Sequence, residues 1–133
     1  MREDLKDSLA LAINVRKQSY SKYSGYNVGA VLVTRSGKKY TGCNIENNGI
    51  QSICAERVAF CKALSEGERN FDHILVIGAP ADADELERCL PCGYCRQFMS
   101  EFVKEDFKVY TIYGNKVEEY SMKELLPYAF KMK

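Results

Sequence analysis

The segment from His73 to Ala79 reads HILVIGA, and Ile74 to Ala79 is the longest apolar run in the 133-residue chain. A short run of this kind, rich in β-branched residues, is typical of a β-strand. The run does not alternate between apolar and polar residues, so we expect the strand to be covered on both faces. The segment therefore predicts a sheet that lies between two layers of helices.

The flanking sequence supplies the other elements of that architecture. Apolar residues at helical or strand spacing, with turn residues between them, define each segment. A Ser121 and Glu124 pair also forms a capping box for a last short helix that ends at Pro127. We expect helices over 4–20, 54–65 and 92 to about 104, and strands over 28–34, 39–43, 73–79, 108–113 and 116–120. This order predicts one domain, residues 1–133, with an α/β fold: a three-layer α/β/α sandwich around a mixed five-stranded sheet.

The charge balance argues against a polyanionic partner. Lysine and arginine total 19 and aspartate and glutamate total 18, for a net charge of +1. Without a surplus of positive charge we expect no nucleic-acid binding. The charged segment from Met1 to Ser8 does not resemble a signal peptide, and the longest apolar run is too short to cross a bilayer. We therefore expect no membrane partner and a cytoplasmic location.

Six cysteines and a single histidine, His73, limit the kinds of metal site and catalytic site that the chain can hold. In a reducing compartment, cysteines indicate metal binding or core packing rather than disulfides. One histidine excludes an HExxH zinc site, and we expect His73 to be structural or on the surface. No GxSxG elbow, phosphate-binding GxxxxGK[ST] loop or GxGxxG motif is present, so neither a serine hydrolase nor a nucleotide-phosphate site is supported.

Cys92 and Cys95 lie three residues apart in Pro91-Cys-Gly-Tyr-Cys95, at the start of a predicted helix. This spacing places both sulfurs on one face, beside the free N–H groups of the first turn. The positive end of the helix dipole favours thiolates, the form in which cysteine binds zinc. Alone, the CxxC pair is also compatible with a redox pair or with half of a structural zinc site.

Cys54 begins a second predicted helix and is followed by Ala55, Glu56 and Arg57. If the two helix starts face one another, three thiolates meet and leave one tetrahedral position open, as in a catalytic zinc site. Glu56 could then reach a water molecule at that position and act as a proton shuttle. We hypothesise that Arg57 donates a hydrogen bond to a ligand sulfur and offsets the negative charge of the thiolates.

The pattern Cys54-Ala-Glu56 followed by Pro91-Cys-Gly-Tyr-Cys95 matches the zinc-deaminase signature, with cysteine in place of histidine. The wider sequence resembles the small, single-domain cytidine deaminases. The likeness extends over most of the chain, through the segments 23–32 (YSGYNVGAVL), 42–47 (GCNIEN), 54–57 (CAER), 65–67 (SEG), 91–97 (PCGYCRQ) and 125–130 (LLPYAF).

The resemblance implies a function and a set of roles. It implies hydrolytic deamination of cytidine and 2′-deoxycytidine to uridine and 2′-deoxyuridine plus ammonia, in pyrimidine salvage, with one zinc ion per chain. In this family the positions of Cys54, Cys92 and Cys95 bind zinc, and that of Glu56 shuttles protons. The remaining implied positions contact the nucleoside: Asn44 and Glu46 at the ribose, Tyr26 and Ala55 at the base, and Phe130 in a neighbouring subunit's site. The last feature implies a homotetramer with shared active sites.

Several alternatives stay open at this level. The blasticidin S deaminases share the zinc motif and a tyrosine near the Tyr26 position, but not the Asn44 to Asn47 run. A structural zinc site would need a fourth ligand, for which Cys43, Cys61, Cys89 and His73 are candidates. Otherwise we expect these three cysteines to be structural, with Cys61 in the core because it lies seven residues after Cys54. A thioredoxin-like role for the CxxC pair is disfavoured, because the βαβ context expected before a redox CxxC is poor in this sequence.

Overall fold

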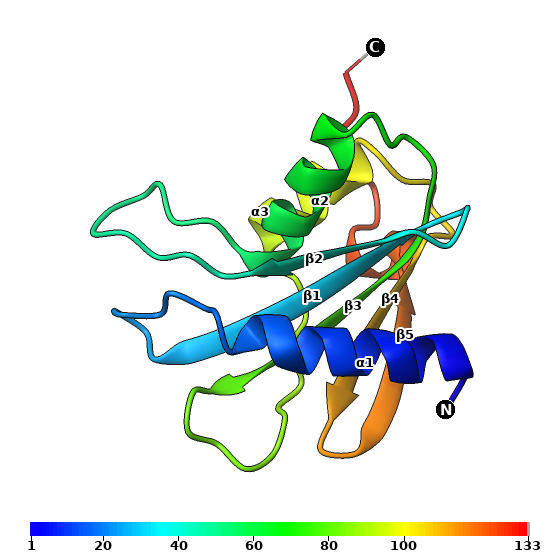
Figure 1. Cartoon of the computed structure of the whole chain (residues 1–133). Helices are drawn as coiled ribbons and strands as arrows, with labels where there is room; N and C mark the ends of the chain where they lie inside the picture. The colour runs from blue at the N-terminus through cyan, green and yellow to red at the C-terminus, as the bar shows by residue number, and fades with distance from the viewer. Residues whose placement is uncertain (133) are drawn as a thin grey trace.

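The computed structural model describes residues 1–132 and contains four helices and five strands in the predicted order (Figure 1). They are α1 (Glu3–Arg16), β1 (Tyr26–Thr34), β2 (Lys39–Cys43), α2 (Ala55–Ser65), β3 (Phe71–Pro80), α3 (Gly93–Ser100), β4 (Lys108–Tyr113), β5 (Lys116–Ser121) and α4 (Met122–Leu125). The strands form one sheet in the order β2-β1-β3-β4-β5. Within the described residues, no helix is long and apolar enough to cross a membrane.

The sheet is mixed, as the sequence predicts. Strand β1 pairs antiparallel with both β2 and β3, β3 runs parallel to β4, and β4 pairs antiparallel with β5. The parallel pair is connected through α3, because parallel strands need a crossover. This crossover places the start of α3 beyond the end of β3.

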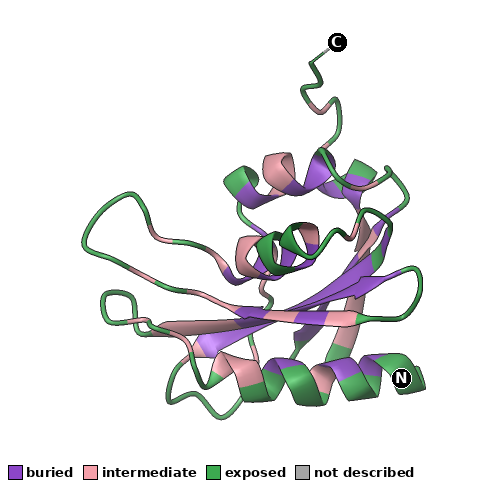
Figure 2. Cartoon of the chain, turned by 45° about the horizontal axis from the view of Figure 1, so that its top comes forward, coloured by how far each residue is buried: buried purple, intermediate pink, exposed green. Residues whose placement is uncertain are grey.

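Helices cover both faces of the sheet, which confirms the three-layer architecture (Figures 1 and 2). Strand β3 lies at the centre and is buried from His73 to Ala79. Its side chains alternate: Ile74 and Val76 join the core beneath α2 and α3, whereas Leu75 and Ile77 join the core beneath α1. The apolar run thus contributes to two cores, which explains why it lacks polar alternation.

Phe60, which is fully buried in α2, fixes the position of that helix. Its ring contacts Phe71 on β3 edge-on, with a centroid distance of 5.2 Å, and Phe98 on α3, with a centroid distance of 6.5 Å. Edge-to-face contacts of this kind hold aromatic rings in defined orientations. The cluster therefore ties α2 and α3 to each other and to the sheet.

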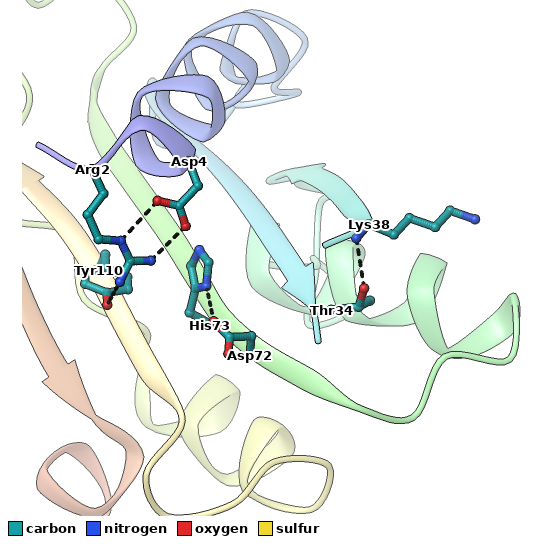
Figure 3. A network of polar contacts seen from close by, with 7 residues as sticks. All are labelled: Arg2, Asp4, Thr34, Lys38, Asp72, His73 and Tyr110. Carbon is teal, nitrogen blue, oxygen red and sulfur yellow. Dashed lines mark hydrogen bonds and ion pairs between the residues drawn. The ribbon is translucent and has the colours of Figure 1, made fainter. Parts of the chain in front are cut away.

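A polar contact holds the start of α1 against β4, next to His73 on β3 (Figure 3). Arg2 pairs with Asp4 and donates a hydrogen bond of 3.2 Å to the Tyr110 hydroxyl. His73 is buried, packs edge-on against Tyr110, and has its Nδ1 atom 2.8 Å from Asp72 Oδ2. The single histidine is therefore structural, which is one of the two outcomes that the sequence predicts.

Two helices are shorter than predicted. Helix α1 ends at Arg16 rather than at residue 20, because the Tyr20 backbone bonds to residues 44 and 46 of the loop that follows β2. Helix α3 ends at Ser100 rather than near residue 104, where the chain turns back toward β4. In both cases tertiary hydrogen bonding or chain reversal overrides a local helical pattern.

Candidate active site

Three cysteines from two helix starts meet at one point. Cys54 is the N-cap of α2, Cys92 is the N-cap of α3, and Cys95 lies in the first turn of α3. Their sulfur atoms all lie within 4.8 Å of one another, and the Cys54 and Cys92 sulfurs are 4.0 Å apart. The two helices meet because the Phe60 cluster packs them side by side on the same face of the sheet.

The spacing of the sulfurs fits a tetrahedral zinc ion. With zinc–sulfur bonds of ordinary length, two thiolate ligands lie about 3.8 Å apart. Among residues 1–132, no fourth cysteine, histidine, aspartate or glutamate joins the group. A structural zinc site would require such a ligand, whereas a catalytic site keeps the fourth position open for solvent or substrate. The geometry therefore favours the catalytic arrangement over the structural one.

Arg57 lies beside the thiols as the sequence predicts. One Nη atom is 3.7 Å from the Cys54 sulfur and 3.4 Å from the Ser52 carbonyl oxygen, and the guanidinium stacks on the Tyr94 ring at 4.5 Å. A hydrogen bond from the Cys95 thiol, together with the Arg57 guanidinium, lowers the pKa of the Cys54 thiol to about 5. Cys54 is thereby prepared as a thiolate, the form that binds metal.

Glu56 is almost fully buried, with 4% of its surface exposed. Burial, reinforced by the negative charge of Cys54, raises the pKa of its carboxyl to about 7. A carboxyl that changes its protonation state near neutral pH can both accept and return a proton. This property distinguishes Glu56 from the exposed helix charge that its sequence position alone would suggest.

A cavity of about 370 Å³ opens beside the thiols and holds most of the predicted site residues. Its walls are formed by Ser24, Tyr26, Val28, Asn44, Glu46, Ser52, Ile53, Cys54, Ala55, Glu56, Cys89, Leu90 and Cys92. Two larger cavities, of about 530 and 620 Å³, lie elsewhere, and none of the three clustered cysteines lines them. We therefore assign the candidate site to the smaller cavity, where the reactive groups gather.

Asn44 and Glu46 line the cavity but also stabilise its rim. The Asn44 side chain accepts a bond from the Val28 backbone N–H and donates one to the Tyr26 carbonyl. Glu46 accepts bonds from the Ser24 hydroxyl and from two backbone N–H groups of the preceding turn. The Ser24 hydroxyl bond is the main cause that lowers the pKa of the Glu46 carboxyl. Both polar groups are thus held in place at the cavity mouth.

Tyr26 presents its ring to the cavity, and Ala55 forms part of the same wall. Burial raises the pKa of the Tyr26 phenol, and the nearby Cys89 thiol and Glu87 carboxyl raise it further. Phe130, by contrast, does not line this cavity: its side chain is 67% exposed, and its carbonyl accepts a bond from Gln97. Of the predicted substrate-contacting residues, Phe130 is therefore the one that the single chain does not bring to the site.

Two sequence expectations about cysteines are wrong. Cys61 is exposed, not packed in the core, because the buried face of α2 carries Ala55, Ala59, Phe60 and Ala63 and position 61 points away from it. Strands β3 and β4 are parallel and flank α3, so the CxxC pair does lie in a βαβ unit. The third cysteine at the same point, rather than the lack of a βαβ unit, is what argues against a redox pair.

Cys89 is a site residue that the sequence analysis missed. The sequence predicts a structural role for it, yet it lines the cavity, and burial together with the charge of Glu56 raises the pKa of its thiol to about 12. Its distance of three residues from Cys92 was the only available signal. A lone cysteine in a loop is more often a packing residue, so this signal was too weak.

The three-layer fold, the three-thiol centre and the buried carboxyl beside it define a zinc enzyme of the α/β class. Residues 2–111 match the family model described as the cytidine and deoxycytidylate deaminase zinc-binding region. The chain belongs to this family, as the resemblance predicts.

Relatives and solved structures agree with this assignment. A cytidine deaminase from Sporosarcina psychrophila is 40% identical over 129 residues, covering 96% of this chain and 91% of the relative. The crystal structure of a cytidine deaminase from Burkholderia pseudomallei has a TM-score of 0.83 and 37% identity, and the match covers 98% of this chain and all of the other. A blasticidin-S deaminase from Bacillus cereus is 32% identical over 107 residues, covering 77% of this chain and 75% of the relative.

Proposed function

We propose that the chain is a zinc-dependent cytidine deaminase that converts cytidine and 2′-deoxycytidine to uridine and 2′-deoxyuridine with release of ammonia. The observation that carries the proposal is the convergence of the Cys54, Cys92 and Cys95 thiols beside a cavity whose wall contains two of them and the buried carboxyl of Glu56. Cys54, Cys92 and Cys95 would hold one zinc ion per chain. The identity of about 40% to cytidine deaminases over most of the chain supports cytidine as the substrate.

The zinc ion, when bound, supplies Lewis acidity that makes water nucleophilic near neutral pH. Glu56 takes a proton from the attacking water and delivers it to N3 of the pyrimidine, which makes C4 more electrophilic. The same carboxyl then takes the remaining proton of that water from the new C4 hydroxyl and gives it to the amino group, which leaves C4 as ammonia. These transfers require a group that titrates near neutrality, which matches the raised pKa of Glu56.

The residues of the cavity wall support proposals for the remaining substrate contacts. Asn44 and Glu46 combine an amide and a carboxylate at the cavity mouth, and such a pair can hydrogen-bond the hydroxyls of a ribose. Tyr26 would pack its ring on the pyrimidine, and Ala55 would offer backbone groups to the edge of the base. Binding through the sugar explains why a nucleoside should be preferred over free cytosine.

Arg57 is proposed to tune the centre through Cys54 rather than to touch substrate. We expect Arg57→Ala to lower kcat about tenfold, because an uncompensated thiolate donates more charge to zinc and weakens its acidity. The rate of cytidine loss and the zinc content should be measured together. Lysine keeps the charge, so Arg57→Lys should recover part of the rate, and an unchanged rate in Arg57→Ala would exclude this role.

Phe130 is proposed to complete the site of a neighbouring subunit in a homotetramer. Its exposed ring and the still more exposed Tyr128 belong to a C-terminal segment, and neither residue lines the cavity of its own chain's site. We expect light scattering to give a tetramer, and Phe130→Ala to lower kcat/KM for cytidine about tenfold or more. A monomer with full activity would contradict the shared-site arrangement. Lys116→Ala, at the exposed start of β5, serves as a control.

We also propose that the protein acts on free nucleosides in the cytoplasm, in pyrimidine salvage. The near-zero net charge offers no general attraction for phosphates. Nucleotides and nucleic acids should therefore be poor substrates.

The test is a deaminase panel with purified, zinc-loaded protein. We expect a fall in ultraviolet absorbance with cytidine and 2′-deoxycytidine, and little or no change with cytosine, CMP or adenosine. Blasticidin S is the alternative substrate, supported by the 32% identity to a deaminase of that compound. Faster turnover of blasticidin S than of cytidine would replace the proposal, and zinc binding without turnover of any aminopyrimidine would indicate a structural module.

A further inference from the structure

Gly78, in the central strand, lies directly beneath the wall of the candidate site. It pairs with Val28 across β1 and β3 and lies on the face of the sheet that carries Ile74 and Val76, beneath α2 and α3. A Cβ atom built on Gly78 would lie 2.7 Å from the Cys89 sulfur and 2.9 Å from Cε2 of Tyr26. Both neighbours line the cavity, so the space above Gly78 is filled by two wall residues that meet there.

Backbone hydrogen bonds limit how far Cys89 can move away from Gly78. The loop between β3 and α3 folds back along the sheet, where the Glu87 N–H donates to the Gly78 carbonyl at 2.8 Å. Two residues later, the Cys89 N–H donates to the Thr111 hydroxyl on β4 at 3.3 Å. The backbone is therefore tied to the sheet at Cys89 itself and two residues before it.

The Tyr26 ring is the movable partner. Its backbone is held, because its N–H donates to the Ser24 hydroxyl and its carbonyl accepts from Asn44. The ring, however, can rotate about its side-chain bonds, and the open space beside it is the cavity. An atom added at Gly78 would thus push the ring toward the space that a substrate would occupy.

We propose that Gly78 is a positioning residue for the nucleoside site: the missing side chain creates the slot, closed by Cys89, that seats the Tyr26 ring as the base-contacting wall. This inference rests on the proposed function for its substrate, but the seating of the ring is a property of the structure itself. Gly78 acts on binding rather than on proton transfer. The three clustered thiols and Glu56 lie at the starts of α2 and α3, outside the slot, so a change at Gly78 leaves their positions in place.

The test compares Gly78→Ala with the wild-type protein in cytidine turnover. We expect KM to rise about tenfold while kcat stays within about threefold, since overpacking moves a binding wall and leaves the reacting groups in place. Zinc content should not change. The double variant Gly78→Ala/Cys89→Ala, which moves one heavy atom from position 89 to position 78, should bring KM back to within about threefold of wild type.

The matched control is Gly29→Ala in the neighbouring strand β1. There a Cβ would lie 2.3 Å from the Ala12 carbonyl oxygen, on the opposite face of the sheet. Gly29→Ala should therefore lower the thermal midpoint and leave KM unchanged when assayed well below that midpoint. An unchanged KM in Gly78→Ala, or an equal rise in Gly29→Ala, would overturn the proposal.

A crystal structure of Gly78→Ala separates this inference from the proposed function. If wild-type protein does not deaminate cytidine, the proposed function fails, yet displacement of the Tyr26 ring into the cavity still supports the slot, and a ring in its wild-type position overturns it. If Gly78→Ala does not accumulate as folded protein, Cys89→Val, which adds bulk against the same ring edge, takes its place. The same expected rise in KM and the same overturning result then apply.

Discussion

Replacing Glu56 by glutamine should lower kcat for cytidine by about a thousandfold or more, because general acid–base catalysis by one side chain contributes about 10² to 10⁴ and this carboxyl is proposed to act in more than one transfer. Glutamine keeps the size of the side chain and cannot accept or return a proton. Zinc content should remain at one per chain, since Glu56 is not part of the group of three thiols. Steady-state rates and metal analysis on the same preparation check both expectations.

A control for this variant is Glu101→Gln, at the exposed end of α3. It makes the same chemical change outside the cavity and should leave the rate unchanged. The role of Glu56 as proton carrier would be wrong if Glu56→Gln retained more than about a tenth of the wild-type rate, since that loss is smaller than a lost proton shuttle produces.

Replacing Cys95 by serine should remove both the metal and the activity. Cys95 is fully buried in the first turn of α3, and a neutral hydroxyl is a much poorer zinc ligand than a thiolate. We expect bound zinc to fall from one per chain to a small fraction, and cytidine turnover to become undetectable. The thermal midpoint should also fall, because a ligand that binds only the folded state stabilises that state.

Cys61→Ser is the matched control for this loss. Cys61 is exposed on α2 and lies outside the group of clustered thiols, so its replacement should leave zinc content, turnover and thermal midpoint unchanged. Stoichiometric zinc in purified Cys95→Ser would refute the three-cysteine centre. Equal losses of zinc in both variants would show that the assay reports general thiol damage.

Most of the fold could be predicted because its signals are local. The run from Ile74 to Ala79, the strands over 108–113 and 116–120, and the capping box at Ser121 each depend on residues a few positions apart, and each is confirmed. The ends of α1 and α3 were predicted less well. The end of α1 depends on hydrogen bonds from a distant loop, and nothing in the residues near Arg16 encodes those bonds.

Some properties of the candidate site could likewise be predicted from local sequence, and others depend on tertiary packing. The spacing of Cys92 and Cys95 and the offset of Glu56 from Cys54 are sequence properties, and both pairs lie at helix starts as expected. The burial of Glu56, which raises its pKa, is a tertiary property. So is the exposure of Cys61, because seven residues along a helix preserve a face but do not say which face meets the core.

The sheet, the two helix starts and the donor atoms follow from local sequence, because periodicity and short spacing act within single elements. The meeting of positions 54 and 92 depends on long-range packing, since the Phe60 ring cluster, not any local pattern, packs α2 against α3. Long-range packing also brings Tyr26 and Cys89 together over Gly78, where the two side chains form one wall of the cavity. These three residues come from two strands and a loop, and contact between them depends on strand register and loop path, which no short stretch of sequence specifies.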